Sequence, residues 1–227
     1  MHHYLEADSI QQSFNERQVL TDVYLTCETG QVVCLLGRNG TGKSTLIKIL
    51  FGTLRADNRF VRIDGVIYPK PYRNRTEMAY LPQHHFIPGH FTISKAVKLF
   101  LGRDKLPLFI NDPVLAPLVS QKIREFSGGE LRYFEVKLLM QSPAKFILLD
   151  EPFSNVSPLL VDAIKAMITA ASPHKGIILT DHDYHNALDV ASRYYLLTDG
   201  GIKTITDKAE LIRWGYVPES RRAELMG

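Results

Sequence analysis

The residues best suited to bind phosphate lie in one short stretch of the chain. They fit the phosphate-binding pattern G-x-x-x-x-G-K-[ST] and read Gly37, Arg38, Asn39, Gly40, Thr41, Gly42, Lys43, Ser44 and Thr45. Glycines let the backbone approach a polyphosphate closely, and the free N–H groups at a helix N-terminus attract its charge. Lys43 can reach the β- and γ-phosphates, and the Ser44 hydroxyl can bind Mg²⁺. The sequence therefore predicts a polyphosphate site.

A pair of carboxylates could supply the rest of the chemistry. Asp150 and Glu151 directly follow the apolar run 146–149, which is typical of a buried strand. In open α/β sheets, the carboxyl ends of the strands face the ligand. Asp150 can hold Mg²⁺ directly or through water, and Glu151 can accept a proton from an attacking water. An acidic turn after a strand is the simpler interpretation, but the phosphate loop favours the catalytic one.

These residues need a strand, a turn and a helix to position them, and the flanking sequence supplies all three. Residues 31–36 form an apolar run, and residues 46–50 continue as a helix that Gly52 can end. Continuous apolar strands that alternate with helices indicate an α/β fold with a mostly parallel sheet, covered on both faces. We expect further strands near 5–13, 19–26, 60–68 (a hairpin turning at Asp64-Gly65), 78–81, 145–149, 176–180, 193–198 and 202–205, and helices near 92–101, 127–140, 157–171, 184–191 and 208–213.

Composition limits the classes of protein that fit. A chain of 227 residues that is 45% hydrophobic predicts one large globular domain. The net charge of +3 is too small to indicate nucleic-acid binding. Cys27 and Cys34 suggest no disulfide framework, and Cys34 falls inside a strand, so we expect reduced thiols. No apolar run approaches membrane-spanning length and no signal peptide is evident, so a membrane role would need a partner.

The order of the motifs resembles that of the ATP-binding cassette (ABC) ATPases. Five elements match, over nearly the whole chain: the phosphate loop, Gln83 after a strand, the signature Phe126-Ser127-Gly128-Gly129-Glu130, the strand ending in Asp150-Glu151, and His182 after the next strand. The signature is the specific part, because many P-loop proteins share the phosphate loop and the acidic strand end. The resemblance implies a P-loop NTPase core with a mostly parallel sheet, an N-terminal antiparallel β layer and an inserted helical subdomain. We expect a single domain over 1–227, with its core at 1–83 and 143–227 and the helical subdomain at about 84–142.

The same resemblance implies a role for each matching residue. It implies catalytic roles for Lys43, Gln83, Glu151 as general base and His182 as a switch near the γ-phosphate. Mg²⁺ would be bound by Ser44, Gln83 and Asp150, and ATP by residues 37–45. Phe14 occupies the place of an aromatic that stacks on adenine; packing of this ring on the sheet is the alternative interpretation.

The signature implies a partner. In the family, Ser127, Gly128, Gly129 and Glu130 would bind the ATP held by the opposite cassette. Since this chain has one phosphate loop and one signature, a second cassette is expected, most simply another copy. Two positions depart from the family pattern. Phe126 and Glu130 replace the usual leucine and glutamine, although Ser127 and Glu130 keep a capping box. Ser157 replaces an aspartate that normally reaches across the dimer, and we expect it to cap the next helix.

The loop at residues 84–91 contains three histidines, but no matching cysteine or carboxylate set lies nearby in the sequence to indicate a metal site. Its apolar residues Phe86, Ile87 and Phe91 instead suggest a docking surface for membrane subunits. The resulting hypothesis is an ATP-binding and ATP-hydrolysing subunit of an ABC transporter, using ATP and Mg²⁺ at the cytoplasmic face of the cell membrane. A soluble single-cassette ATPase that serves an assembly or repair complex is the alternative.

Overall fold

The main sheet runs through the centre of the protein. The computed structural model describes residues 1–182, 184–222 and 225. Six strands of this part form the sheet in the order β10-β9-β3-β8-β7-β6, with all neighbours parallel except the β9–β10 hairpin. Their bounds are β3 (Val32–Leu36), β6 (Met78–Leu81), β7 (Phe146–Asp150), β8 (Gly176–Thr180), β9 (Arg193–Thr198) and β10 (Gly201–Ile205). The mostly parallel sheet predicted from the sequence is confirmed.

A second, antiparallel sheet comes from the N-terminal part of the chain. Its order is β2-β1-β4-β5, with β1 (Tyr4–Phe14), β2 (Arg17–Glu28), β4 (Asn58–Ile63) and β5 (Val66–Ile67). The β4–β5 turn lies at Asp64 and Gly65, whose φ angles are 53° and 79°. Positive φ at both central residues matches a tight hairpin turn, as the Asp-Gly pair predicts.

Side chains of β3 alternate between two hydrophobic cores. Val33 and Leu35 pack with helix α1 (Lys43–Phe51) and with the antiparallel sheet. Val32, Cys34 and Leu36 belong to the core on the opposite face, which helices cover. Because a strand exposes successive side chains on opposite faces, a fully apolar strand needs a cover on both sides. The P-loop helix therefore lies between the two sheets.

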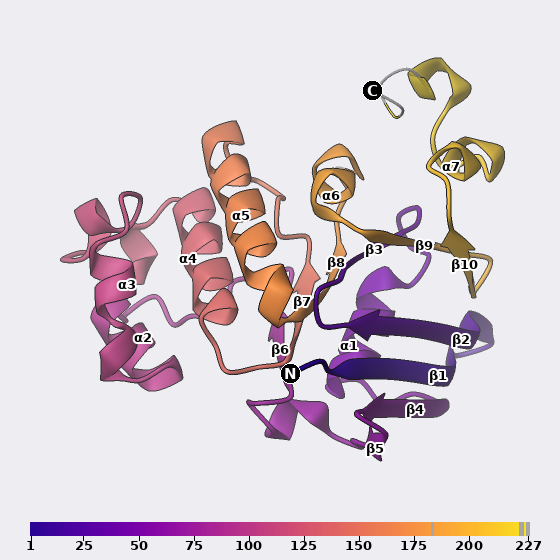
Figure 1. Cartoon of the computed structure of the whole chain (residues 1–227), viewed down its shortest axis with the longest axis horizontal. Helices are drawn as coiled ribbons and strands as arrows, with labels where there is room; N and C mark the ends of the chain where they lie inside the picture. The colour runs from indigo at the N-terminus through magenta and orange to yellow at the C-terminus, as the bar shows by residue number, and fades with distance from the viewer. Residues whose placement is uncertain (183, 223–224, 226–227) are drawn as a thin grey trace.

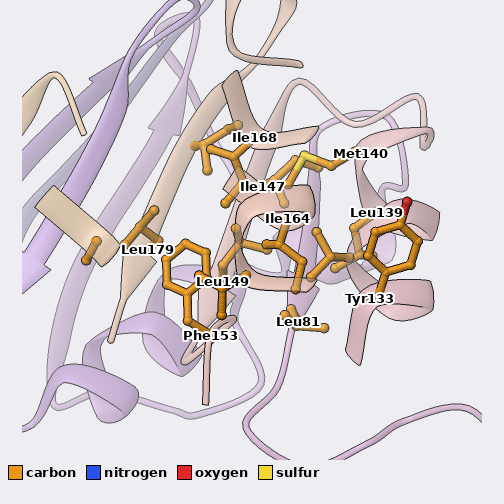
Figure 2. Packing of buried hydrophobic residues seen from close by; sticks show 14 of the residues in the cluster. Leu81, Tyr133, Leu139, Met140, Ile147, Leu149, Phe153, Ile164, Ile168 and Leu179 are labelled. Atoms are coloured by element: carbon orange, nitrogen blue, oxygen red, sulfur yellow. The ribbon is translucent and has the colours of Figure 1, made fainter. Parts of the chain in front are cut away.

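The helical cover of the other face includes α4 (Gly128–Met140), α5 (Pro158–Ala171), α6 (Tyr184–Val190) and α7 (Ala209–Arg213). Helices α4 and α5 lie side by side (Figure 1). Figure 2 shows part of their contact with the sheet, where Ile147 and Leu149 of β7 share one cluster with Ile164 and Ile168 of α5. Within the described residues, no helix is both long enough and apolar enough to cross a bilayer.

Residues 84–142 contribute no strand to either sheet. They form α2 (Ile93–Phe100), α3 (Pro107–Ile110), α4 and several short 3-10 turns, as expected, and α2 and α3 lie at the end of the molecule opposite β1 and β2 (Figure 1). Thr92 caps α2 by accepting a hydrogen bond from the backbone N–H of Lys95. The division into a core and a helical subdomain at these boundaries stays a prediction.

Two expectations need correction. Ile87, expected at a docking surface, is buried in the core on the helical face. Ser157 occupies the N-cap position of α5, but its hydroxyl makes no capping hydrogen bond. The C-terminal segment also contributes to this core, because Val217 and Leu225 are buried in it with Ile87. The two errors concern tertiary packing and a single hydrogen bond, which local sequence does not determine.

Both cysteines are buried, free thiols. Burial raises the pKa of the Cys27 thiol to about 12. Burial also raises the pKa of Cys34, which lies in β3 directly before the phosphate loop. The thiols are therefore protonated at neutral pH, and the expectation of reduced cysteines is confirmed for both residues.

The helical-face core gives a direct stability prediction. Ile164 is fully buried between α5 and β7. Ile164→Ala is expected to lower the free energy of unfolding by about 2–5 kcal/mol, since it removes apolar contacts and leaves a cavity. Urea unfolding followed by circular dichroism measures this loss. Ile67→Ala, at a side chain that is 52% exposed, is the control and should cost less than about 1 kcal/mol. Equal losses in the two variants would contradict the packing described.

Candidate active site

The phosphate loop connects β3 to α1 and is held tightly by neighbouring strands. Gly42 precedes α1 with φ 104°, and a Cβ there would lie 2.7 Å from Val19 Cγ1 on β2. At Gly37 a Cβ would lie 2.7 Å from the carbonyl oxygen of Leu197 on β9. Larger residues at these two positions would displace the loop from the sheets. The glycines thus serve the protein's own packing as well as the approach of a ligand.

Lys43 begins helix α1, and its side chain folds back over the loop. Its Nζ donates to the carbonyl oxygens of Gly37 at 2.6 Å and Arg38 at 3.1 Å. Burial lowers the pKa of this amine, while the nearby Glu151 and Asp150 carboxylates oppose that shift. The ammonium therefore lies against two backbone carbonyls of the loop, near the two acids.

A cleft of about 410 Å³ opens over this loop. Phe14 extends from the β1–β2 hairpin into its wall and is 45% exposed. The lining joins the hairpin, the loop and the acidic strand end: Phe14, Arg17, Val19, Asn39, Gly40, Gly42, Lys43, Ser44, Thr45, Glu151 and His182. The cleft therefore brings together Phe14, most of residues 37–45, Glu151 and His182, but none of residues 127–130.

Asp150 ends β7 and is fully buried. Its Oδ1 accepts hydrogen bonds from Ser44 Oγ at 3.0 Å and Thr180 Oγ1 at 2.9 Å. Its Oδ2 accepts from the Tyr80 hydroxyl at 3.2 Å. Burial and the charge of Asp150 raise the pKa of Tyr80, so that hydroxyl stays a donor at neutral pH. These contacts place Asp150 beside the first turn of α1.

Glu151 is held in an unusual backbone conformation, with φ 56°. Its Oε2 accepts from Gln83 Nε2 at 3.0 Å and Ser154 Oγ at 3.2 Å, and its Oε1 lies 2.6 Å from His182 Nε2. A non-glycine residue at positive φ costs energy, and such strain gathers at functional sites. Gln83, Glu151 and His182, far apart in the sequence, therefore meet at one edge of the cleft.

The signature lies elsewhere in the described structure. Ser127 caps α4, where its Oγ accepts from the Glu130 backbone N–H at 3.3 Å while Glu130 Oε2 accepts from the Ser127 backbone N–H at 2.8 Å. The predicted capping box is thus present. Ser127, Gly129 and Glu130 line no part of the phosphate cleft, whereas Gly128 lines a neighbouring cavity with Gln83 and Glu151.

Arg38 also differs from its expected position. Its side chain turns away from the cleft and donates to the Gly215 carbonyl at 2.8 Å. Sequence reasoning missed Tyr80, Thr180 and Ser154, which donate to the two acids. It also missed Arg17 and Val19 in the cleft wall. Thr180 and Tyr80 could have been predicted from the sequence to lie near the acids, because both are near the carboxyl ends of predicted parallel strands.

Comparison with known proteins establishes the family. Residues 20–154, more than half of the chain, match the sequence profile of the family described as ABC transporter. The chain belongs to the ABC transporter ATP-binding family. As a member, it binds and hydrolyses ATP.

Curated relatives of this ABC protein match over most of their length. The lipopolysaccharide export system ATP-binding protein LptB of Haemophilus influenzae is 34% identical, over 87% of this chain and 88% of the relative. LptB of Escherichia coli K12 is 30% identical, over 94% of each chain. A probable ABC transporter ATP-binding protein of Azorhizobium caulinodans is 28% identical, over 97% of this chain and 82% of the relative.

Solved structures agree on the fold of this ABC ATPase. The ATP-binding subunit of an ABC transporter superposes with a TM-score of 0.80 at 23% identity, over 98% of this chain and 99% of that one. An ATP-binding cassette of an ABC transporter in its ADP conformation gives 0.77 at 21% identity, over 99% and 98%. The predicted fold class is confirmed.

The position of Lys43 in the ABC cleft gives a binding prediction. Lys43→Ala removes the cation from the loop, and charge-assisted hydrogen bonds contribute about 1.5–3 kcal/mol, so ATP affinity should fall by about 10- to 100-fold. Isothermal titration calorimetry measures the dissociation constant, and a thermal melt checks folding. Arg38→Ala is the matched control in the same loop, and its affinity should stay within about threefold of the parent. An unchanged affinity in Lys43→Ala would refute the assigned role.

Proposed function

We propose that this chain powers a membrane transporter: ATP binding closes a dimer of two copies, and hydrolysis reopens it, moving partner membrane subunits. The observation that carries the proposal is the division of the site. The phosphate loop, Glu151 and His182 line one cleft, while Ser127 and Gly129, at the capped start of α4, line no part of it. A second chain can supply the missing signature. The core at 1–83 and 143–227 and the helical subdomain at about 84–142 are the two moving parts.

Mg²⁺ fits the residues beside the phosphate loop. Ser44 and Asp150 offer a hydroxyl and a carboxylate in direct contact, and Gln83 offers an amide oxygen nearby. Oxygen ligands of this kind suit Mg²⁺, which keeps several waters and binds through few protein groups and substrate phosphates. Among the described residues, no group of three histidine, cysteine or acidic side chains favours a softer metal. When bound, Mg²⁺ would neutralise charge on the β- and γ-phosphate oxygens.

Glu151 is the proposed general base. It takes a proton from a water, whose oxygen bonds to the γ-phosphorus as the bond to the β–γ bridging oxygen breaks, leaving ADP and phosphate. Gln83 and His182 already contact both oxygens of the carboxylate. Gln83 and His182 therefore hold the Glu151 carboxylate against the cleft wall. When water and the γ-phosphate bind, either side chain can form a hydrogen bond with them instead. Phe14 provides an exposed ring for the adenine.

An apolar groove offers a docking site for the membrane subunits. Phe86 and Phe100 meet there edge to face, with ring centroids 5.7 Å apart. The groove holds about 260 Å³ and lies where residues 84–142 meet the rest of the chain, lined by Phe51, Tyr72, Arg75, Met78, Ala79, Tyr80, Phe86, Phe100, Leu101, Leu138, Leu139, Ser142 and Pro143. Exposed apolar surface of this kind typically binds another protein. We assign it to an apolar cytoplasmic segment of a membrane subunit.

This assignment places the chain at the cytoplasmic face of the cell membrane, held by its partners. The LptB relatives make lipopolysaccharide export the first transport assay to apply.

Glu151→Gln tests the base and the dimer together. The amide cannot take the proton, and removal of a general base typically slows turnover by about 10² to 10⁴. ATP binding should not weaken, because a negative charge facing the phosphates is removed. With ATP bound and no longer hydrolysed, the variant should elute as a dimer in ATP and as a monomer in ADP during size-exclusion chromatography. Turnover at the parent rate would exclude Glu151 as the base.

A second substitution identifies the surface that closes the dimer. Ser127→Arg, added to Glu151→Gln, places a bulky side chain at the exposed start of α4, where the neighbouring chain's nucleotide would bind. The double variant should remain a monomer in ATP while it still binds one ATP per chain by calorimetry. A dimer that persists in the double variant would count against closure through the signature.

The groove gives a separate prediction for coupling. Phe86→Asp places a charge in the apolar groove and should prevent co-purification with the membrane subunits while basal ATP hydrolysis stays within about threefold of the parent. Phe91, also expected from the sequence at the docking surface, does not line the groove and packs against His90 and Lys95, so Phe91→Asp is the control and should keep the complex. Equal effects of both variants would place docking elsewhere. Function without any membrane partner would favour a soluble cassette.

A further inference from the structure

Two oppositely charged side chains are buried in α4, one turn after the signature. Arg132 is 4% exposed and Glu135 is fully buried. Arg132 NH1 lies 3.5 Å from Glu135 Oε2, so the two charges offset each other in part. Charged groups are rarely buried unless each is paired and hydrogen-bonded. The hydrogen-bond partners of Arg132 and Glu135 therefore indicate which part of the chain this pair positions.

Those partners are backbone groups around Gln83. The Arg132 guanidinium donates to the Pro82 carbonyl at 2.9 Å and also to the Gln83 carbonyl. Glu135 Oε1 accepts from the Phe86 backbone N–H at 2.8 Å, and Oε2 lies 2.9 Å from His85 Nδ1. A guanidinium presents its donors in a rigid fork, so two adjacent carbonyls fix its plane and their own orientation. Residues 82–86 are thus attached to α4 at both ends.

Gln83 extends from this attached segment to the general base. Its Nε2 donates to Glu151 Oε2 at 3.0 Å. The start of α4 carries Ser127, the residue proposed to contact the neighbouring chain's ATP. We propose that Arg132 and Glu135 are positioning residues that hold Gln83 against Glu151 and join it rigidly to the signature helix. This inference rests on the proposed roles of Gln83 and of the signature.

The pairing has a consequence for a closed dimer. When α4 shifts to bring Ser127 onto the neighbour's ATP, Arg132 and Glu135 carry the Gln83 backbone with it. The catalytic geometry at a chain's own ATP then depends on how its signature engages the other ATP. ATP would then be hydrolysed at both sites together, because α4 of each chain contacts the neighbour's ATP and also positions Gln83 at the chain's own ATP.

A second, largely buried ion pair, between Lys137 of α4 and Asp112, provides a control. Lys137 pairs with Asp112, which also accepts from the Tyr133 hydroxyl at 2.8 Å. Asp112 further accepts from the backbone N–H groups of Val114 and Leu115. This pair joins α4 to residues 112–115 and has no contact with residues 82–86 among the interactions of the described chain. It resembles Arg132–Glu135 as a largely buried ion pair involving α4, although Lys137 is more exposed than Arg132, and it lacks the link to Gln83.

The test compares single and double variants of the full-length chain. Glu135→Gln keeps the side-chain shape but loses the charge and one acceptor. It should lower kcat for ATP hydrolysis by about tenfold or more with the ATP dissociation constant within about twofold, because misplacement of a catalytic group slows the reaction without removing ligand contacts. Asp112→Asn should leave kcat within about twofold of the parent. Thermal melts ensure that every variant is assayed well below its unfolding midpoint.

The decisive comparison adds Gln83→Ala. If Glu135 acts through Gln83, the double variant Gln83→Ala/Glu135→Gln should have a kcat within about twofold of Gln83→Ala alone. Multiplied losses in the double variant, or equal losses in Glu135→Gln and Asp112→Asn, would overturn the positioning role and leave the Gln83 assignment intact. An unchanged kcat in Gln83→Ala itself would overturn both.

Arg132→Lys covers the case in which Glu135→Gln does not fold. Lysine keeps the positive charge, but its ammonium lacks the planar fork of donors that binds two adjacent carbonyls. It should show the same loss of kcat, the same unchanged ATP affinity and the same absence of a further loss in the Gln83→Ala background. A parent-like kcat in Arg132→Lys would contradict the proposal.

Discussion

The buried carboxylate of Asp150 determines where the parts of the cleft lie. It has no solvent contact, and it accepts hydrogen bonds from α1, β8 and β6 through Ser44, Thr180 and Tyr80. A carboxylate buried without donors is costly, so these three elements must meet at the end of β7. Glu151 is the next residue, and its place at the cleft follows from the same contacts. The phosphate loop and the proposed base are therefore positioned by the same buried carboxylate.

From that point, hydrogen bonds extend outward in two directions. Toward the nucleotide, Glu151 contacts His182 and lies near Lys43, both in the cleft wall. Toward the helical segment, Glu151 contacts Gln83, whose backbone is bonded to Arg132 on α4. Glu151 therefore lies between the main sheet and the helical segment that carries the signature. Gln83 thus forms a polar link between α4 and the end of β7, beside the apolar packing of α4 on the sheet.

The sequence was sufficient to predict features that are formed by residues close together in the chain. The strand–loop–helix around Lys43, the capping box at Ser127 and the Asp64-Gly65 turn all use residues within a few positions of each other, so periodicity and turn chemistry suffice. Meetings between distant residues were predictable only where parallel strands end at a common edge, as for Glu151 and His182.

Other placements depend on three-dimensional packing alone. Arg38 bonds to Gly215, 177 positions away, and nothing in its neighbourhood indicates that choice. Ile87 was expected at a docking surface because it lies in a loop with the apolar Phe86 and Phe91, yet its side chain packs into the helical-face core. Nothing in the sequence indicated the roles of Arg132 and Glu135, since their partners are backbone groups some 50 positions earlier.

Because both native cysteines are buried, a spectroscopic label can be attached selectively to an introduced, exposed cysteine. A maleimide reagent reacts with an accessible thiolate, whereas Cys27 and Cys34 are buried and protonated. A single cysteine placed at an exposed site, such as position 157, would therefore carry a fluorophore or spin label without removal of the native thiols. Labels at that site in two copies could report the distance between subunits during the ATP cycle.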